Sequence, residues 1–174
     1  MRSAFTLLEI LTVLVVMMIL VTLLIPALSS LKNRAELASC TSNLKSLYVG
    51  ANSYVQEQGH WPQVGTKDIR SPVYTEAWVA ALARYGVSRK SWICPTMQRL
   101  MKSPDYEKGK GVRVDYFATP FGDGAQTPYK YMTQPWFIER GNVHGNGNLV
   151  IFTDGSVVSL NDIAKDNRFT SPPP

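Results

Sequence analysis

The stretch Ile10–Leu28 reads ILTVLVVMMILVTLLIPAL, and it decides the class of this 174-residue chain. Only Thr12 and Thr22 interrupt its apolar run. A helix of this length spans about 30 Å, which is the thickness of the hydrocarbon core of a bilayer. We therefore interpret the stretch as a membrane span. The alternatives are a cleaved signal peptide, which has a shorter apolar core, and a buried helix of a soluble protein, which has a polar face.

Charge is distributed unevenly along the chain. Glu9 is the only ionisable side chain between Phe5 and Leu28, whereas the 17 basic and 12 acidic residues from Ser29 onward give a net charge of +5. With 45% hydrophobic and 18% charged residues, the composition excludes an intrinsically disordered chain. The basic residues are scattered and form no nucleic-acid-binding motif, so we expect no nucleic-acid partner. The sequence predicts one membrane segment joined to one soluble domain.

Glu9 stands out because a carboxylate at the start of a membrane span is expensive to bury alone and usually marks a function. The simpler interpretation is a charge at the membrane edge, which costs little. The neighbouring residues favour the first interpretation. The run Ser3-Ala4-Phe5-Thr6-Leu7-Leu8-Glu9 resembles the cleavage motif of type IV prepilins and type II secretion pseudopilins.

This resemblance implies that a prepilin peptidase cuts after Ala4, where the family usually has glycine, and methylates the new amino group of Phe5. A charged amine in apolar surroundings is costly unless it is paired. Glu9 lies four residues farther along the helix, where it is well placed to meet the amine of a neighbouring subunit. Our hypothesis is that this pairing sets the axial stagger between subunits of a filament.

A helical pattern continues beyond the span. Apolar residues recur at three- and four-residue steps as far as Gln58, and Gly59 and Pro62 end the pattern. A break near Pro26 is an open alternative, because proline disrupts helix interiors. The predicted apolar stripe comprises Leu31, Ala35, Ala38, Leu44, Leu47, Tyr48, Ala51, Tyr54 and Val55.

The later sequence predicts short elements. Glu76–Tyr85 has the pattern of a helix that Gly86 ends, and Val112–Phe117 alternates weakly like a strand. The segment from Lys102 to Gly147 is rich in Gly, Pro and aromatic residues, which predicts ordered loops. The Ser-Pro-Pro-Pro terminus predicts a disordered tail.

The clearest signal for strands lies near the C-terminus. Leu149–Thr153 and Ser156–Leu160 are rich in β-formers and flank Asp154-Gly155. Such a pair of runs predicts a hairpin with a type I′ turn.

Further motifs are similar to those of a large group of bacterial pilin-like proteins. They are Cys40-Thr-Ser-Asn-Leu-Lys-Ser-Leu, Trp61-Pro62, Trp92-Ile-Cys94-Pro95, and a histidine, His144, followed after nine residues by Asp154-Gly155. The resemblance implies an α+β, pilin-like fold. In it, a long N-terminal helix with a membrane-spanning and an amphipathic half packs on a small antiparallel sheet. The expected segments are a leader (1–4), a hydrophobic assembly helix (5–28), an amphipathic half-helix (29–58), a globular domain (59–170) and a tail (171–174).

The two cysteines are predicted to be bonded. An even pair in an exported protein is typical of a disulfide, so we expect Cys40 to pair with Cys94, with two separate buried thiols as the alternative. A zinc site made of these cysteines with His60 and His144 is not favoured, because the four residues lack short ligand spacing.

Other metal chemistry receives little support from the sequence. Some pseudopilins hold calcium in a C-terminal loop, and the carboxylates to examine for it are Asp123, Asp154 and Asp162. The spacing of an EF-hand is not present, so we expect no cofactor.

The resemblance implies a filament subunit with no enzymatic activity of its own. It would be inserted in the bacterial cytoplasmic membrane by a single span, with its globular domain outside the cytoplasm. Its partners would be copies of itself or related subunits, the prepilin peptidase and the assembly platform of a secretion system or pilus. Two alternatives stay open, namely a monomeric membrane-anchored binding domain and a tethered hydrolase that uses His144 and Asp154.

Overall fold

The computed structural model describes residues 7–64, 68, 71–102, 106–107, 111–121, 127–130 and 133–165. The chain divides into two compact units, Met1–Ala35 and Glu36–Pro174. The boundary falls inside the predicted segment 29–58, because the helix becomes part of a packed core only after Ala35. The secondary structure is of the α+β class, as predicted.

The long helix α1 runs from Leu7 to Gln58 and contains Pro26 without interruption. The helix is therefore continuous where a break was an open alternative, and the Ser29 hydroxyl donates a hydrogen bond to the Pro26 carbonyl at 2.8 Å. Every described residue before Glu36 is exposed in the single chain. Among the described residues, α1 is the one helix long and apolar enough to cross a membrane.

Within the second unit, α1 buries one face. Its buried residues are Cys40, Leu44, Leu47, Gly50, Ala51 and Val55, a spacing that follows the helical repeat. From Leu44 onward the predicted stripe is buried or, at Tyr48 and Tyr54, half-buried, but the prediction was wrong for Leu31, Ala35 and Ala38, which are exposed. The helix ends where Gly59 adopts a φ of +77° and donates its N–H to the Val55 carbonyl at 2.8 Å.

The second helix, α2, spans Pro72–Ala83 and therefore begins four residues before the predicted start at Glu76. Its start follows from Ser71, whose hydroxyl accepts a hydrogen bond from the Val73 N–H, and from proline in the first turn. A 3-10 helix η1 (Arg89–Trp92) and α3 (Pro95–Met101) follow.

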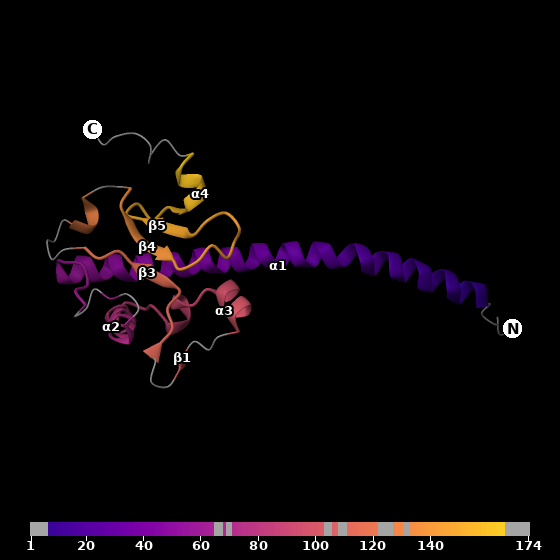
Figure 1. The fold of residues 1–174 in the computed structure, drawn as a ribbon, viewed down its shortest axis with the longest axis horizontal. Helices are drawn as coiled ribbons and strands as arrows, with labels where there is room; N and C mark the ends of the chain where they lie inside the picture. The colour runs from indigo at the N-terminus through magenta and orange to yellow at the C-terminus, as the bar shows by residue number, and fades with distance from the viewer. Residues whose placement is uncertain are drawn as a thin grey trace. The chain divides into compact units, whose positions relative to one another are not determined.

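Four antiparallel strands form the main sheet in the spatial order β3-β4-β5-β6. Figure 1 shows β3, β4 and β5 alongside the C-terminal part of α1. The strands are β3 (Tyr116–Ala118), β4 (Pro135–Glu139), β5 (Leu149–Phe152) and β6 (Val157–Ser159). The remaining short elements are the two-stranded pair β1 (Tyr106–Glu107) and β2 (Gly111–Val112), η2 (Thr127–Tyr129) and α4 (Leu160–Ile163).

The strand predicted at Val112–Phe117 is present farther along, as β3 at Tyr116–Ala118. The prediction of loops for the rest of Lys102–Gly147 was wrong, because this segment also supplies the inner strand β4. The register of β4 against β5 shifts between Pro135 and Phe137, which leaves the consecutive residues Trp136 and Phe137 both buried. The shift removes the two-residue alternation by which a strand is recognised in a sequence.

The C-terminal hairpin is confirmed, but its predicted type I′ turn is wrong. Strands β5 and β6 pair with Ile151 opposite Val157, and the Gly155 N–H donates to the Phe152 carbonyl at 2.9 Å. Gly155 has a φ of +75°, whereas Asp154 does not have the positive φ that a type I′ turn needs. The third turn residue alone is left-handed, which is typical of a three-residue loop.

All four tryptophans of the chain are buried in one core. The ring of Trp61 lies 5.5 Å from that of Trp78 and 4.9 Å from that of Trp136, between ring centroids. Trp92 and Phe137 continue the cluster at 6.1 Å. Tyr48 joins α1 to this cluster, because its ring lies 4.9 Å from that of Trp136 and its hydroxyl donates to the Thr153 carbonyl at 2.9 Å.

We predict that Leu47→Ala lowers the free energy of unfolding of the second unit by about 2–5 kcal/mol, because Leu47 is fully buried in the core. The matched control is Val49→Ala on the exposed face of the same helix turn, which we expect to change it by less than about 0.5 kcal/mol. Denaturant unfolding followed by tryptophan fluorescence measures both. Equal losses would show that this face of α1 does not contribute to the core.

Candidate functional site

The predicted processing and assembly residues fall at the edge of the described chain. Ala4 and Phe5 lie outside the described residues, as does the calcium candidate Asp123. Glu9 lies in the exposed first turn of α1, where its backbone carbonyl accepts a hydrogen bond from the Thr12 hydroxyl at 2.9 Å.

The structure brings the two cysteines together. Cys40 and Cys94 are fully buried, and their Sγ atoms lie 2.7 Å apart as two thiols. The predicted pairing therefore needs no rearrangement of the backbone, and the disulfide itself stays a prediction.

Cys94 is fixed by the packing of α3 against α1. The Glu36 carboxylate accepts hydrogen bonds from the Thr96 hydroxyl at 2.9 Å and from the Arg99 guanidinium at 2.8 Å. Asn43 of α1 donates its side-chain amide to the Ile93 carbonyl at 2.8 Å, one residue before Cys94.

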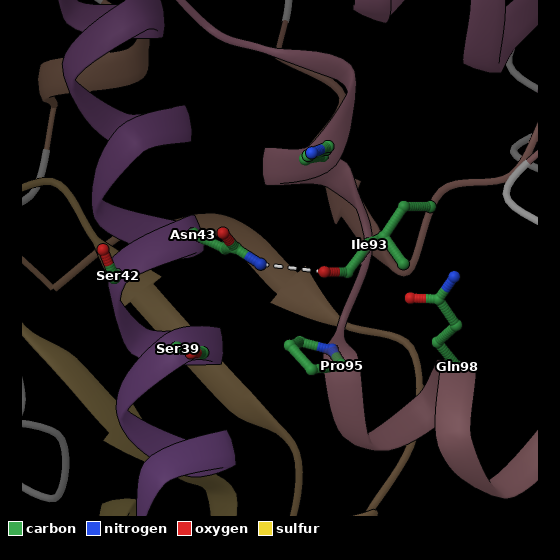
Figure 2. A pocket seen from close by; sticks show the side chains of 7 residues that line it. Ser39, Ser42, Asn43, Ile93, Pro95 and Gln98 are labelled. Atoms are coloured by element: carbon green, nitrogen blue, oxygen red, sulfur yellow. Dashed lines mark hydrogen bonds between the residues drawn. The ribbon is translucent and has the colours of Figure 1, made fainter.

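Figure 2 shows this Asn43–Ile93 bond across a hollow of about 370 Å³ between α1 and the start of α3. Its lining residues are Ser39, Ser42, Asn43, Lys90, Ile93, Pro95 and Gln98. The same two segments carry the cysteines.

Asp115 holds the backbone of Cys94 from the other side. Its carboxylate accepts the Cys94 N–H at 2.9 Å and forms an ion pair with Arg113 at 2.7 Å. Asp115 is fully buried, and only 11% of the Arg113 side chain is exposed. A buried carboxylate is tolerated here because a cation and a backbone donor share its charge.

Glu139 and His144 complete the arrangement. Glu139 is the last residue of β4 and is 1% exposed. One carboxylate oxygen, Oε2, accepts the Leu149 N–H at 3.3 Å. The other, Oε1, lies 3.3 Å from Nε2 of His144, and the same Nε2 lies 3.8 Å from the Cys94 Sγ.

The loop between β4 and β5 sets the position of His144. The Asn142 side-chain carbonyl accepts hydrogen bonds from the N–H groups of Gly145 (3.1 Å) and Gly147 (3.0 Å). Both glycines have a φ above +80°, a conformation that side chains with a Cβ rarely adopt. The glycines and asparagines around His144 therefore shape the loop that presents the imidazole.

We name Cys40, Cys94, Glu139 and His144 the Cys–Glu–His cluster. One ligand atom from each residue lies within 4.8 Å of all the others. It is the one group of at least three such side chains among the described residues.

Burial and contacts between its members shift the pKa values of three residues of the cluster. Burial raises the pKa of Glu139 to about 8, with the contact to Cys94 acting in the same direction and His144 opposing it. The contact with Cys94 lowers the pKa of the Cys40 thiol, and the same contact together with burial raises the pKa of Cys94.

The sequence identified three members of the cluster but grouped them with the wrong fourth residue. The histidine considered with them, His60, has its Nδ1 against the Trp61 carbonyl at 3.0 Å and its ring beside Tyr54. Glu139 was missed, although one signal for it exists. It is the single acidic residue of the apolar strand PWFIE, and a carboxylate in an apolar strand calls for a partner.

The remaining candidate carboxylates belong to other interactions. Asp154 accepts the Ser156 N–H at 2.8 Å within the hairpin turn. Asp162 accepts hydrogen bonds from the Ser159 hydroxyl and the Asn146 amide, both at 2.6 Å. The hydrolase alternative paired His144 with Asp154, whereas His144 faces Glu139 and Cys94.

Comparison of the chain with protein-family models, with curated proteins and with solved structures gives no match.

We predict that Asp115→Ala lowers the free energy of unfolding by about 3–5 kcal/mol, because it removes a buried charged partner of Arg113 and the acceptor of the Cys94 N–H. The control is Glu57→Ala at an exposed position of α1, for which we expect a change within about 0.5 kcal/mol. Chemical denaturation at neutral pH compares the two variants, and an Asp115→Ala protein as stable as the control would contradict the assignment.

Proposed function

We propose that this chain is a structural subunit of a type II secretion pseudopilus or a type IV-like pilus. In this proposal the chain is cleaved after Ala4 and polymerises through its N-terminal helix. The observation that carries the proposal is the motif Ser3–Glu9, which leads directly into an apolar helix whose residues up to Ala35 are exposed in the single chain.

The exposed apolar surface of α1 supports two successive environments for the subunit, first the membrane and then the filament. A contiguous apolar surface of this extent is not stable in water and needs either lipid or other proteins around it. A helix satisfies its own backbone hydrogen bonds, so it is stable in the membrane before assembly. In the filament, the same surfaces of neighbouring subunits would replace the lipid.

Glu9 supplies the specificity that apolar contact lacks. Apolar helices slide against each other with little preference for one register, because dispersion and burial are not directional. A carboxylate that meets the methylated amine of Phe5 on the next subunit is directional. An uncompensated charge in such an interface costs much more than the pair contributes, so wrong registers are excluded.

The second unit fits the part of a subunit that lies outside the membrane. It has its own aromatic core, formed by the buried face of α1 after Glu36 together with the sheet. In the proposal this unit stands on the outer side of the bacterial cytoplasmic membrane, and the subunit interacts with the prepilin peptidase and an assembly platform. The proposed role is mechanical and involves no catalysis.

The processing step gives a direct prediction. We expect the N-terminal peptide of the mature protein from its native cell to begin at Phe5 and to carry a methyl group on its amine. The variant Ala4→Phe should block cleavage, because the site requires a small residue. Mass spectrometry of the N-terminal peptide decides between these forms, and a mature protein that retains Arg2 would support a plain membrane anchor instead.

The assembly step gives a second prediction. Glu9→Gln keeps the size of the side chain but removes its charge, and we expect assembly to weaken by more than about 100-fold per interface. This factor corresponds to the roughly 3 kcal/mol lost when one partner of a buried pair is removed. The matched control is Thr22→Val in the same helix, which should assemble normally. Electron microscopy of sheared filaments and the monomer content of the membrane measure the result, and normal filaments from Glu9→Gln would refute the pairing.

A further inference from the structure

We propose that the dithiol form of this protein binds a divalent metal ion of the zinc class in the Cys–Glu–His cluster. The ligands are the Sγ atoms of Cys40 and Cys94, the Glu139 carboxylate and Nε2 of His144. The inference rests on the second unit alone and is independent of the proposed filament role.

The ligand set has the chemistry of a structural zinc site. Zinc prefers thiolate and imidazole ligands, accepts a carboxylate, and is four-coordinate and tetrahedral in closed sites. Two thiolates, a carboxylate and a neutral imidazole around Zn²⁺ leave a net charge of −1, which equals that of the common Cys₃His site. Hard cations such as Ca²⁺ and Mg²⁺ are disfavoured because two of the four ligands are sulfur.

The distances suit this geometry. Zinc–ligand bonds of 2.0–2.3 Å at tetrahedral angles place neighbouring ligand atoms roughly 3.3–3.8 Å apart. Nε2 of His144 lies 3.3 Å from Oε1 of Glu139 and 3.8 Å from Sγ of Cys94. The two sulfur atoms, at 2.7 Å, are closer than a metal requires. They need to separate by roughly 1 Å when the ion enters.

The burial of Glu139 is the observation that a cysteine pair alone does not explain. Its Oε1 accepts no well-aligned hydrogen bond within the described part of the chain, although it faces Nε2 of His144 at 3.3 Å and the residue is 1% exposed. A buried carboxyl oxygen that lacks a good hydrogen bond costs free energy. A metal ion at the centre of the cluster would bind this oxygen together with the imidazole and both sulfurs.

The surroundings orient the ligands as an outer shell does in metal sites. The Leu149 N–H holds the second oxygen of Glu139, and the Cys94 N–H is anchored on Asp115. Backbone hydrogen bonds from Thr96 and Met97 act to lower the pKa values of the Cys40 and Cys94 thiols, respectively. Each ligand thus comes from a segment that other bonds already fix.

The test uses the full-length chain in detergent, kept reduced and freed of metal with a chelator. We expect it to bind one Co²⁺ per chain, with the visible bands of tetrahedral cobalt and a thiolate-to-cobalt charge-transfer band. Zn²⁺ should displace the cobalt and raise the melting temperature of the protein, because an ion that binds only the folded state stabilises that state. A folded, reduced chain that binds no stoichiometric metal would overturn the proposal.

Matched variants assign the ligands. His144→Gln and Glu139→Gln should each weaken Zn²⁺ binding by at least about tenfold, whereas His60→Gln, which changes the only other histidine, should leave it unchanged. Equal affinities of the His144→Gln and His60→Gln proteins would contradict the site. Circular dichroism of the metal-free variants establishes that each one is folded.

A second measurement needs no substitution. Diamide takes two electrons and two protons from the two thiols, forming one Cys40–Cys94 disulfide, and thereby removes both thiolate ligands. The cobalt bands should disappear on oxidation and return on reduction. Metal binding that persists unchanged in the oxidised chain would exclude the cysteines as ligands and overturn the proposal.

Discussion

The burial of one face of α1 beyond Glu36 is the constraint on which the second unit depends. The main sheet has only four short strands, too little surface for an independent core, so it needs a helix to cover it. Leu44, Leu47 and Ala51 provide that cover, and burial of each leucine contributes about 1.5–3 kcal/mol. Tyr48 connects this face to Trp136 of the inner strand. The positions of β4, of α3 and of the loop that carries His144 all follow from this packing.

Periodic local signals explain which parts of the fold the sequence predicts. Two such signals identify an element on their own: the apolar repeat from Leu44 to Val55, and the β-rich runs on either side of Asp154-Gly155. In both, the hydrogen bonds that form the element join residues that are close in the sequence. Strand β4 has no such signal. Its bulge places Trp136 and Phe137 on buried sides in succession, and only pairing with two distant strands makes the segment PWFIE a strand.

The candidate site was harder to predict for the same reason. Cys40, Cys94 and His144 were each noticeable as residue types, but their spacing in the sequence contains no information about which fourth residue joins them. Glu139 approaches the cysteines through Asp115, which lies just before β3. The Asp115 carbonyl accepts the Arg140 N–H at 2.7 Å, and its own N–H donates to the carbonyl of Trp92, two residues before Cys94, at 2.8 Å. A search for short ligand spacings fails when every ligand comes from a different element.

The Cys–Glu–His cluster can cross-link segments of the second unit in two ways, by a disulfide or by a bound metal ion. Cys40 is the first fully buried residue of α1, so a link at this point holds the helix where its packed part begins. A disulfide joins α1 to the start of α3 and leaves Glu139 and His144 facing each other in the interior, with 3.3 Å between Oε1 and Nε2. A metal ion joins the same two segments to the end of β4 and to the β4–β5 loop as well. The second arrangement gives the carboxylate and the imidazole a ligand role, and it gives a physical reason for a carboxylate in the interior of a small aromatic core.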